Sequence, residues 1–162
     1  MKQLFTLIVF LLLACHTMAQ IDPLIGKKAP NIVLTNLEGQ EQKLSDLEGK
    51  VVLIDFWAGW CGPCIKDIEE WLKPMYDDYK DKGFEVFAVS FDRSENAWQK
   101  SVARHGLPWQ HVWDYQTKSA FKDYQVYQIP TSYLVDQTGT IVARDLKRGR
   151  LSREIDRLLK QN

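Results

Sequence analysis

The sequence predicts an α/β domain with a mixed central sheet that is flanked by helices on both faces. Apolar runs of strand length alternate with stretches whose apolar residues recur at helical spacing, which is the pattern of strands joined through helices. The run 51–57 is apolar on both faces except for Asp55, as expected of a central strand that is covered on both sides. A hairpin followed by a helix closes the chain, which adds antiparallel strands to the parallel ones.

The amino-terminal part of the domain is expected to be a short hairpin that leads into this central strand. Residues 21–29 form a polar lead-in. Strands are predicted over 31–34 and 41–44, around a turn at 38–40. A second turn, over 45–50, connects the hairpin to the central strand.

A long helix is predicted directly after the central strand. Apolar residues recur at helical spacing at positions 65, 68, 71, 72, 75, 76 and 79. Pro74 lies inside this pattern, so we expect a kink or a break near Lys73. Gly83 is expected to end the helix.

The remaining elements continue the alternation of strands and helices. We expect a buried strand over 84–91 and a helix over 95–105, capped by Ser94 and ended by Gly106. The later elements are a strand over 107–113, a short helix over 117–124, a strand over 132–135, a hairpin turn over 136–139, a returning strand over 140–144 and an amphipathic helix over 151–160.

The segment Cys61-Gly62-Pro63-Cys64 has the spacing of a reversible disulfide at a strand-to-helix turn. Cys61 lies at the expected helix start, where free backbone N–H groups and the helix dipole favour negative charge. Such a position lowers the pKa of a thiol from about 8.5 to roughly 3.5–7.5 and makes it a nucleophile. Cys64 follows one turn later, close enough to attack a mixed disulfide at Cys61. Gly62 leaves room for a partner, and Pro63 suits a first helical turn because its missing N–H costs nothing there.

Other uses of a Cys-x-x-Cys pair fit this sequence less well. A zinc site needs two more ligands, but the only other cysteine is Cys15 and the three histidines complete no Cys₂His₂ pattern. Haem attachment needs a histidine after the second cysteine, where this chain has Ile65. A structural disulfide closing so short a loop would constrain the unfolded chain very little. We therefore interpret the pair as a redox centre and expect no metal site.

Residues 1–19 are interpreted as a signal peptide and residues 20–162 as one domain. A positively charged start, the apolar run 4–13 and small residues before the expected cleavage after Ala19 are typical of a secretory signal. The apolar run is too short to span a membrane as a helix. The alternative is a lipoprotein signal, in which Cys15 would become a lipidated amino terminus. The domain is therefore expected to be periplasmic or otherwise extracytoplasmic, or anchored through Cys15.

The charge balance gives no sign of a strongly charged partner. The chain has 21 Lys and Arg residues and 21 Asp and Glu residues, and removing residues 1–19 takes away one lysine and leaves 20 against 21. Neither nucleic acid nor an anionic membrane surface is indicated by this balance. After cleavage behind Ala19 the chain would keep only two cysteines, so its one pair would be free for chemistry.

The segment 52–64 resembles the active-site segment of thioredoxin nearly position for position. The two-strand lead, the insertion between Asp92 and Tyr124, and the segment Ile129-Pro130-Thr131 resemble the TlpA/ResA-type envelope branch of that superfamily. The resemblance runs from about Gly26 to the end of the chain. It implies a thioredoxin-like fold with an N-terminal β-hairpin and an insertion between the central strands. It also implies a thiol–disulfide oxidoreductase of the bacterial envelope.

The resemblance further implies roles for single residues. It implies a cis peptide bond before Pro130, opposite the cysteines, and backbone contacts from Ile129 to an extended substrate. Asp55 occupies the position of the family's buried acid, where desolvation raises the pKa of a carboxyl and lets it take the proton that Cys64 loses. The alternatives are an ordinary hydrogen-bonded aspartate and a trans proline. Trp60, beside the first cysteine, is expected to contact substrate.

Several positions depart from related patterns. The run 84–91 lacks the lysine that often accompanies the buried acid in cytoplasmic thioredoxins, and Asp67 replaces the ResA-like glutamate three residues after the second cysteine. Pro74 lies ten residues past that cysteine rather than five. The peroxiredoxin pattern, with proline seven and threonine three residues before the nucleophile, is absent because Ile54 and Ala58 stand there. The last point argues against a peroxidase.

The Gly-Pro dipeptide between the cysteines favours a reductant. It matches thioredoxin, whose potential is about −270 mV, rather than the oxidant DsbA at about −120 mV. The substrates would be protein disulfides, and no redox cofactor is needed beyond the two sulfurs. A reductant in an oxidising compartment must be recharged, so the resemblance implies a membrane electron-donor protein. Cytochrome c maturation is the best-known task of the family. The alternatives are a disulfide oxidant or isomerase, and a non-catalytic thioredoxin-fold carrier that holds a soft metal such as Cu(I) on the two cysteines.

Overall fold

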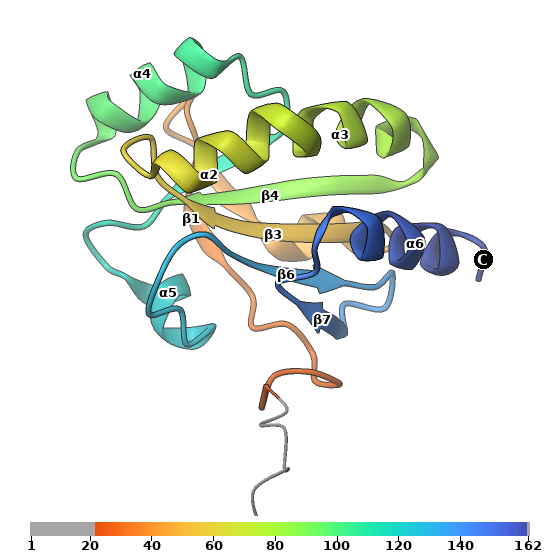
Figure 1. Cartoon of the computed structure of the whole chain (residues 1–162). Coiled ribbons are helices and arrows are strands. Elements are labelled where there is room, and N and C mark those ends of the chain that lie inside the picture. Colours follow the sequence, from red (N-terminus) through yellow and green to blue (C-terminus); the bar gives the residue numbers. More distant parts are fainter. Residues whose placement is uncertain (1–21, 162) are drawn as a thin grey trace, which may run out of the picture.

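The computed structural model describes residues 22–161 and has a five-stranded sheet at its centre (Figure 1). The strands, in spatial order, are β5 (Gln110–Trp113), β4 (Phe84–Ser90), β3 (Val51–Trp57), β6 (Thr131–Val135) and β7 (Ile141–Arg144). The central strand β3 pairs in parallel with β4 and antiparallel with β6. The mixed sheet predicted from the sequence is therefore confirmed. The expected signal peptide and the lipid-anchor alternative at Cys15 lie outside the described residues.

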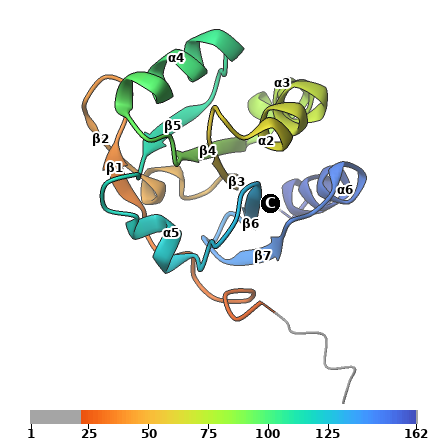
Figure 2. The ribbon, with the colours of Figure 1, turned by 60° about the vertical axis from the view of Figure 1, so that its left-hand side comes forward.

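Helices cover both faces of the sheet, as predicted. One face packs against α2 (Gly62–Asp67), α3 (Lys73–Tyr79), α4 (Glu95–His105) and α6 (Arg148–Leu159), whose apolar side chains share one core cluster with β3 and β4. The other face packs against the amino-terminal hairpin and α5 (Ser119–Asp123) through a second cluster. Figure 2 shows the sheet between these two layers. All residues of β3 and β4 are buried because both of their faces are covered.

The amino-terminal hairpin consists of β1 (Val33–Thr35) and β2 (Glu41–Lys43), which pair antiparallel as predicted. The first strand starts two residues later than expected. The segment predicted as a simple turn over 45–50 is partly the 3₁₀ helix η1 (Leu44–Leu47), so that prediction was wrong in part. The helical turn forms because it brings both of its leucines into the core under the sheet.

The long helix after β3 is interrupted where the sequence predicts a break. Between α2 and α3, the segment η2 (Ile68–Leu72) is π-helical, and the 3₁₀ turn η3 (Lys80–Lys82) ends at Gly83 with φ 95°. Pro74 has no N–H for the carbonyl one turn earlier, and its ring does not fit an unbroken α-helix. A π-turn just before the proline absorbs this mismatch.

The insertion between β4 and β6 supplies α4, β5 and α5. Ser94 Oγ accepts a hydrogen bond from the N–H of Ala97 at 3.3 Å, and Gly106 closes α4 in the left-handed conformation, so both predicted ends of α4 are confirmed. The elements β5 and α5 are shorter than predicted, and α6 starts three residues before the predicted position 151. Within residues 22–161, no helix combines the length and apolar character needed to cross a membrane.

Candidate functional site

The predicted redox pair lies at the start of α2 and forms a disulfide. Cys61 and Cys64 are joined by a bond of 2.03 Å, with their Cα atoms 5.2 Å apart. Cys61 is the N-cap residue of α2, and the N–H of Cys64 donates a hydrogen bond to Cys61 Sγ at 3.2 Å. Both sulfur-bearing residues are buried, whereas Gly62 and Pro63 between them are exposed. The site can therefore place a donor N–H against a thiolate at Cys61.

The loop before the pair is held by a buried carboxylate that the sequence analysis missed. The N–H of Gly59 donates to both Asp92 carboxylate oxygens, at 3.1 and 3.0 Å, and the hydroxyl of Ser90 donates to one of them at 2.9 Å. A Cβ atom on Gly59 would lie 1.8 Å from Ser101 Oγ, so only glycine fits this close approach. Asp92 belongs to no recognisable motif, and no local pattern in the sequence marks it.

Asp55 lies beneath the pair on β3 and borders a cavity of about 210 Å³. Cys64, Asp67 and Pro130 also line this cavity. Desolvation of the buried carboxyl, with smaller contributions from the nearby charges of Asp67 and Asp145, raises the pKa of Asp55 to about 7. The carboxyl accepts no hydrogen bond from residues 22–161, which does not fit the alternative of an ordinary hydrogen-bonded aspartate.

Asp145 is a second residue of this cavity that sequence reasoning missed. It follows β7 with φ 50°, and its Oδ1 accepts a hydrogen bond from the N–H of Ser132 at 2.8 Å. This contact holds a negative charge at the same cavity as Asp55 and Asp67. Asp145 is far from both in the sequence, so only the folded sheet brings the three carboxyls together.

The other predicted site residues lie around the pair. The peptide bond between Ile129 and Pro130 is cis, as the resemblance implies, and Pro130 borders the cavity that also reaches Cys64. Trp60 is 59% exposed beside the pair, and with Ile129 it lines a separate groove. Within residues 22–161, no three His, Cys, Asp or Glu side chains come close enough together to hold a metal ion.

Comparison with known proteins identifies the family. The model of the AhpC/TSA family matches residues 25–144. The chain belongs to this family. Among curated proteins, a thiol-disulfide oxidoreductase ResA of Bacillus cereus is 40% identical over 120 residues, which cover 74% of this chain and 68% of that protein.

Solved structures support the same assignment. The thioredoxin domain of a thiol-disulfide oxidoreductase from Bacteroides vulgatus matches with a TM-score of 0.76 and 34% identity, covering 83% of this chain and 97% of that chain. A thiol:disulfide interchange protein from Bacteroides sp. matches with a TM-score of 0.77 and 33% identity, covering 86% and 93%. The thioredoxin-like fold and the ResA-type resemblance are thereby confirmed. With its Cys61–Cys64 pair, this AhpC/TSA family member is a thiol–disulfide oxidoreductase.

Proposed function

We propose that this chain reduces protein disulfides in an extracytoplasmic compartment through the dithiol of Cys61 and Cys64. The observation that carries the proposal is the disulfide at the start of α2, with the N–H of Cys64 directed at Cys61 Sγ. That N–H stabilises the thiolate once the disulfide is open, and the exposed Gly62 and Pro63 leave this side of the pair accessible. Absence of the peroxiredoxin pattern supports exchange chemistry rather than peroxide reduction.

The first step forms a mixed disulfide. The Cys61 thiolate attacks one sulfur of the substrate disulfide, the substrate S–S bond breaks, and the leaving substrate sulfur departs as a thiolate that takes up a proton. Trp60 and the backbone of Ile129 are proposed to hold the substrate segment beside the attacking sulfur.

The second step releases the substrate and needs a base for the second thiol. Asp55 is proposed to take the proton from the thiol of Cys64 through their shared cavity. The Cys64 thiolate then attacks Cys61 Sγ, the mixed disulfide breaks, and the second substrate sulfur leaves as a thiolate. Two electrons pass from the dithiol to the substrate, and the Cys61–Cys64 disulfide closes.

The direction of exchange is proposed from the dipeptide between the cysteines. Gly62 and Pro63 match thioredoxin, which is a reductant near −270 mV. A reductant outside the cytoplasm must be recharged, and we propose a membrane dithiol protein as the electron donor. Residues 1–19 are proposed as the signal that directs the domain to this compartment, with anchoring through Cys15 as the alternative.

An insulin-reduction assay tests the proposed function. Wild-type protein kept reduced by a dithiol should precipitate the insulin B chain, Cys61→Ser should abolish turnover, and Cys64→Ser should accumulate mixed disulfides. Equilibration with glutathione buffers should give a potential close to that of thioredoxin. A potential near that of DsbA would overturn the reductant assignment, and stoichiometric Cu(I) binding without insulin reduction would replace it with a metal carrier.

A further inference from the structure

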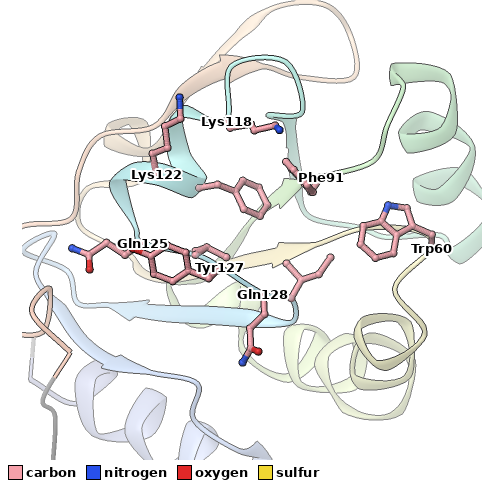
Figure 3. A pocket seen from close by; sticks show the side chains of 10 residues that line it. Trp60, Phe91, Lys118, Lys122, Gln125, Tyr127 and Gln128 are labelled. Atoms are coloured by element: carbon pink, nitrogen blue, oxygen red, sulfur yellow. The ribbon is translucent and has the colours of Figure 1, made fainter.

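A groove that is separate from the cavity lined by Asp55 opens beside Trp60, the residue before Cys61. Its volume is about 560 Å³, and most of its lining is apolar. Figure 3 shows Trp60 on one side of the opening and Lys122 and Gln125 on the other. The apolar side chains that line it come from four parts of the chain: Trp60, Phe91, Phe121, Val126, Tyr127 and Ile129.

Two of the groove's aromatic side chains are unusually exposed for their size. Tyr127 is 89% exposed and Trp60 is 59% exposed, although both are large side chains that normally bury much of their surface. Exposed apolar surface that gathers around a concave site is typical of a surface that binds a partner. Ile129 also lines the groove and directly precedes the cis proline, and Trp60 directly precedes Cys61, so the groove adjoins the redox site.

Two lysines give the groove a positive rim. Lys118 adopts a left-handed backbone with φ 53°, and its Nζ lies 5.5 Å from the centre of the Phe91 ring. Lys122 is exposed one turn further along α5. No carboxylate oxygen of residues 22–161 lies within 4.0 Å of either ammonium group. The rim therefore offers two positive charges that a partner's carboxylates can neutralise.

The position of these lysines is maintained by a buried aspartate. Asp114 is 1% exposed and accepts hydrogen bonds from the N–H groups of Ser119 at 3.0 Å and Phe121 at 3.2 Å. These bonds fix the start of α5 against the sheet. The two positive charges are therefore carried by an anchored element beside the apolar groove.

We propose that this groove is a specificity site for an extended segment of the protein substrate next to its reacting cysteine. The segment would place an aromatic side chain in the groove and an acidic side chain against Lys118 and Lys122. This inference rests on the proposed function, because the segment is positioned by the mixed disulfide at Cys61. The apolar lining selects the aromatic group, and the unpaired lysines select the carboxylate.

The test uses four short peptides that differ at two positions beside one cysteine. The peptides carry phenylalanine or alanine at one position and aspartate or lysine at the other, and each cysteine is in a mixed disulfide with a chromophoric thiol. The pre-reduced protein attacks the peptide sulfur and releases the chromophore, which reports the rate of exchange. We expect the phenylalanine–aspartate peptide to react roughly five- to tenfold faster than the phenylalanine–lysine peptide at low salt, and the difference to shrink at high salt.

The variant Lys118→Glu/Lys122→Glu should reverse the preference for aspartate over lysine. Lys27→Glu/Lys100→Glu is the matched control, because it makes the same change in net charge at exposed lysines that do not line the groove. The control should keep the wild-type preference. The specificity site would be overturned if both double variants changed the peptide preference equally, or if the wild type reacted with all four peptides at the same rate. The proposed function would stand in either case as long as the wild type still reduces insulin.

Two other occupants of the groove are also tested. Sedimentation of the wild type should show a monomer; a dimer that the Lys118→Glu/Lys122→Glu variant abolishes would show that a second copy fills the groove and would overturn the proposal. Faster exchange with all four peptides after residues 1–21 are removed, without any preference among them, would overturn it in favour of the chain's own amino terminus. Failure of the wild-type protein to reduce insulin would instead refute the proposed function itself.

Discussion

Replacing Asp55 with asparagine should stabilise the folded protein near pH 8. Asp55 is buried on β3 and accepts no hydrogen bond from residues 22–161, so its ionised form receives no compensation for leaving water. Asparagine has nearly the same shape and resembles the protonated acid. The variant therefore removes the charge and changes the packing little.

The expected magnitude follows from the pKa of the carboxyl. Burial raises the pKa of Asp55 from 3.8 to about 7. At about 1.4 kcal/mol per pKa unit, ionising this group in the folded state costs roughly 4 kcal/mol of stability. Below pH 3.8 the acid is protonated in both the folded and the unfolded chain, so this cost is absent. Stability is lost as the pH rises from 3.8 to about 7, and above that the loss is complete.

The free energy of unfolding should be measured by urea denaturation across this pH range with the disulfide closed. Asp55→Asn should be more stable than the wild type by up to about 4 kcal/mol at pH 8, with the difference disappearing near pH 4. Asp78→Asn is the control, since it removes a charge from an exposed aspartate outside any ion pair of the described chain. A difference that is zero at pH 8, or equal at both pH values, would refute the reasoning.

Two further predictions concern the close packing at Gly59 and the buried side chain of His111. Gly59→Ala should lower the free energy of unfolding by about 1–3 kcal/mol, because its Cβ meets the Ser101 side chain. Urea denaturation should show most of this loss recovered in the double variant Gly59→Ala/Ser101→Gly. A Gly59→Ala protein as stable as the wild type would contradict the prediction. Burial lowers the pKa of His111 from 6.5 to about 3. As the pH falls from 6.5 toward 3, the unfolded chain binds a proton at this histidine that the folded chain does not, so the free energy of unfolding should fall by up to about 5 kcal/mol. The free energy of unfolding should be measured against pH in the Asp55→Asn background, where the opposing titration of Asp55 is absent. The loss at low pH should disappear when His111→Phe is added. An unchanged loss of stability at low pH in that double variant would contradict the prediction.

Elements of the fold with strong local signals could be predicted to the residue. The central strand has the predicted bounds 51–57, and α4 starts after Ser94 and ends at Gly106 as predicted. Caps and left-handed glycines act within one turn of chain, so the sequence contains their whole cause. The 3₁₀ turn at Leu44–Leu47 depends instead on a core surface supplied by distant strands, and the periodicity of the hairpin segment does not contain that information.

The features of the candidate site also fall into those with a signal in the sequence and those that depend on distant parts of the fold. The disulfide pair followed from the spacing of its own motif, whereas the cis bond before Pro130 was implied only by the resemblance to the thioredoxin superfamily. Asp92 and Asp145 had no such signal, since each acts on a segment far away in the sequence. Their contributions depend on which strand ends the sheet places together, and a single sequence does not specify that placement.

In the proposed mechanism, Asp55 connects the stability of this fold to its chemistry. A carboxyl with several hydrogen bonds would have a low pKa and would be a weak base for a thiol. Here desolvation and the charges of Asp67 and Asp145 raise the pKa of Asp55 to about 7, the range in which a general base is most effective near neutral pH. The free energy that destabilises the folded state is therefore the same free energy that would make Asp55 a base in the proposed second step. A variant that gains stability by removing the charge should lose the proton acceptor for Cys64, so stability and the rate of the second exchange step should change in opposite directions.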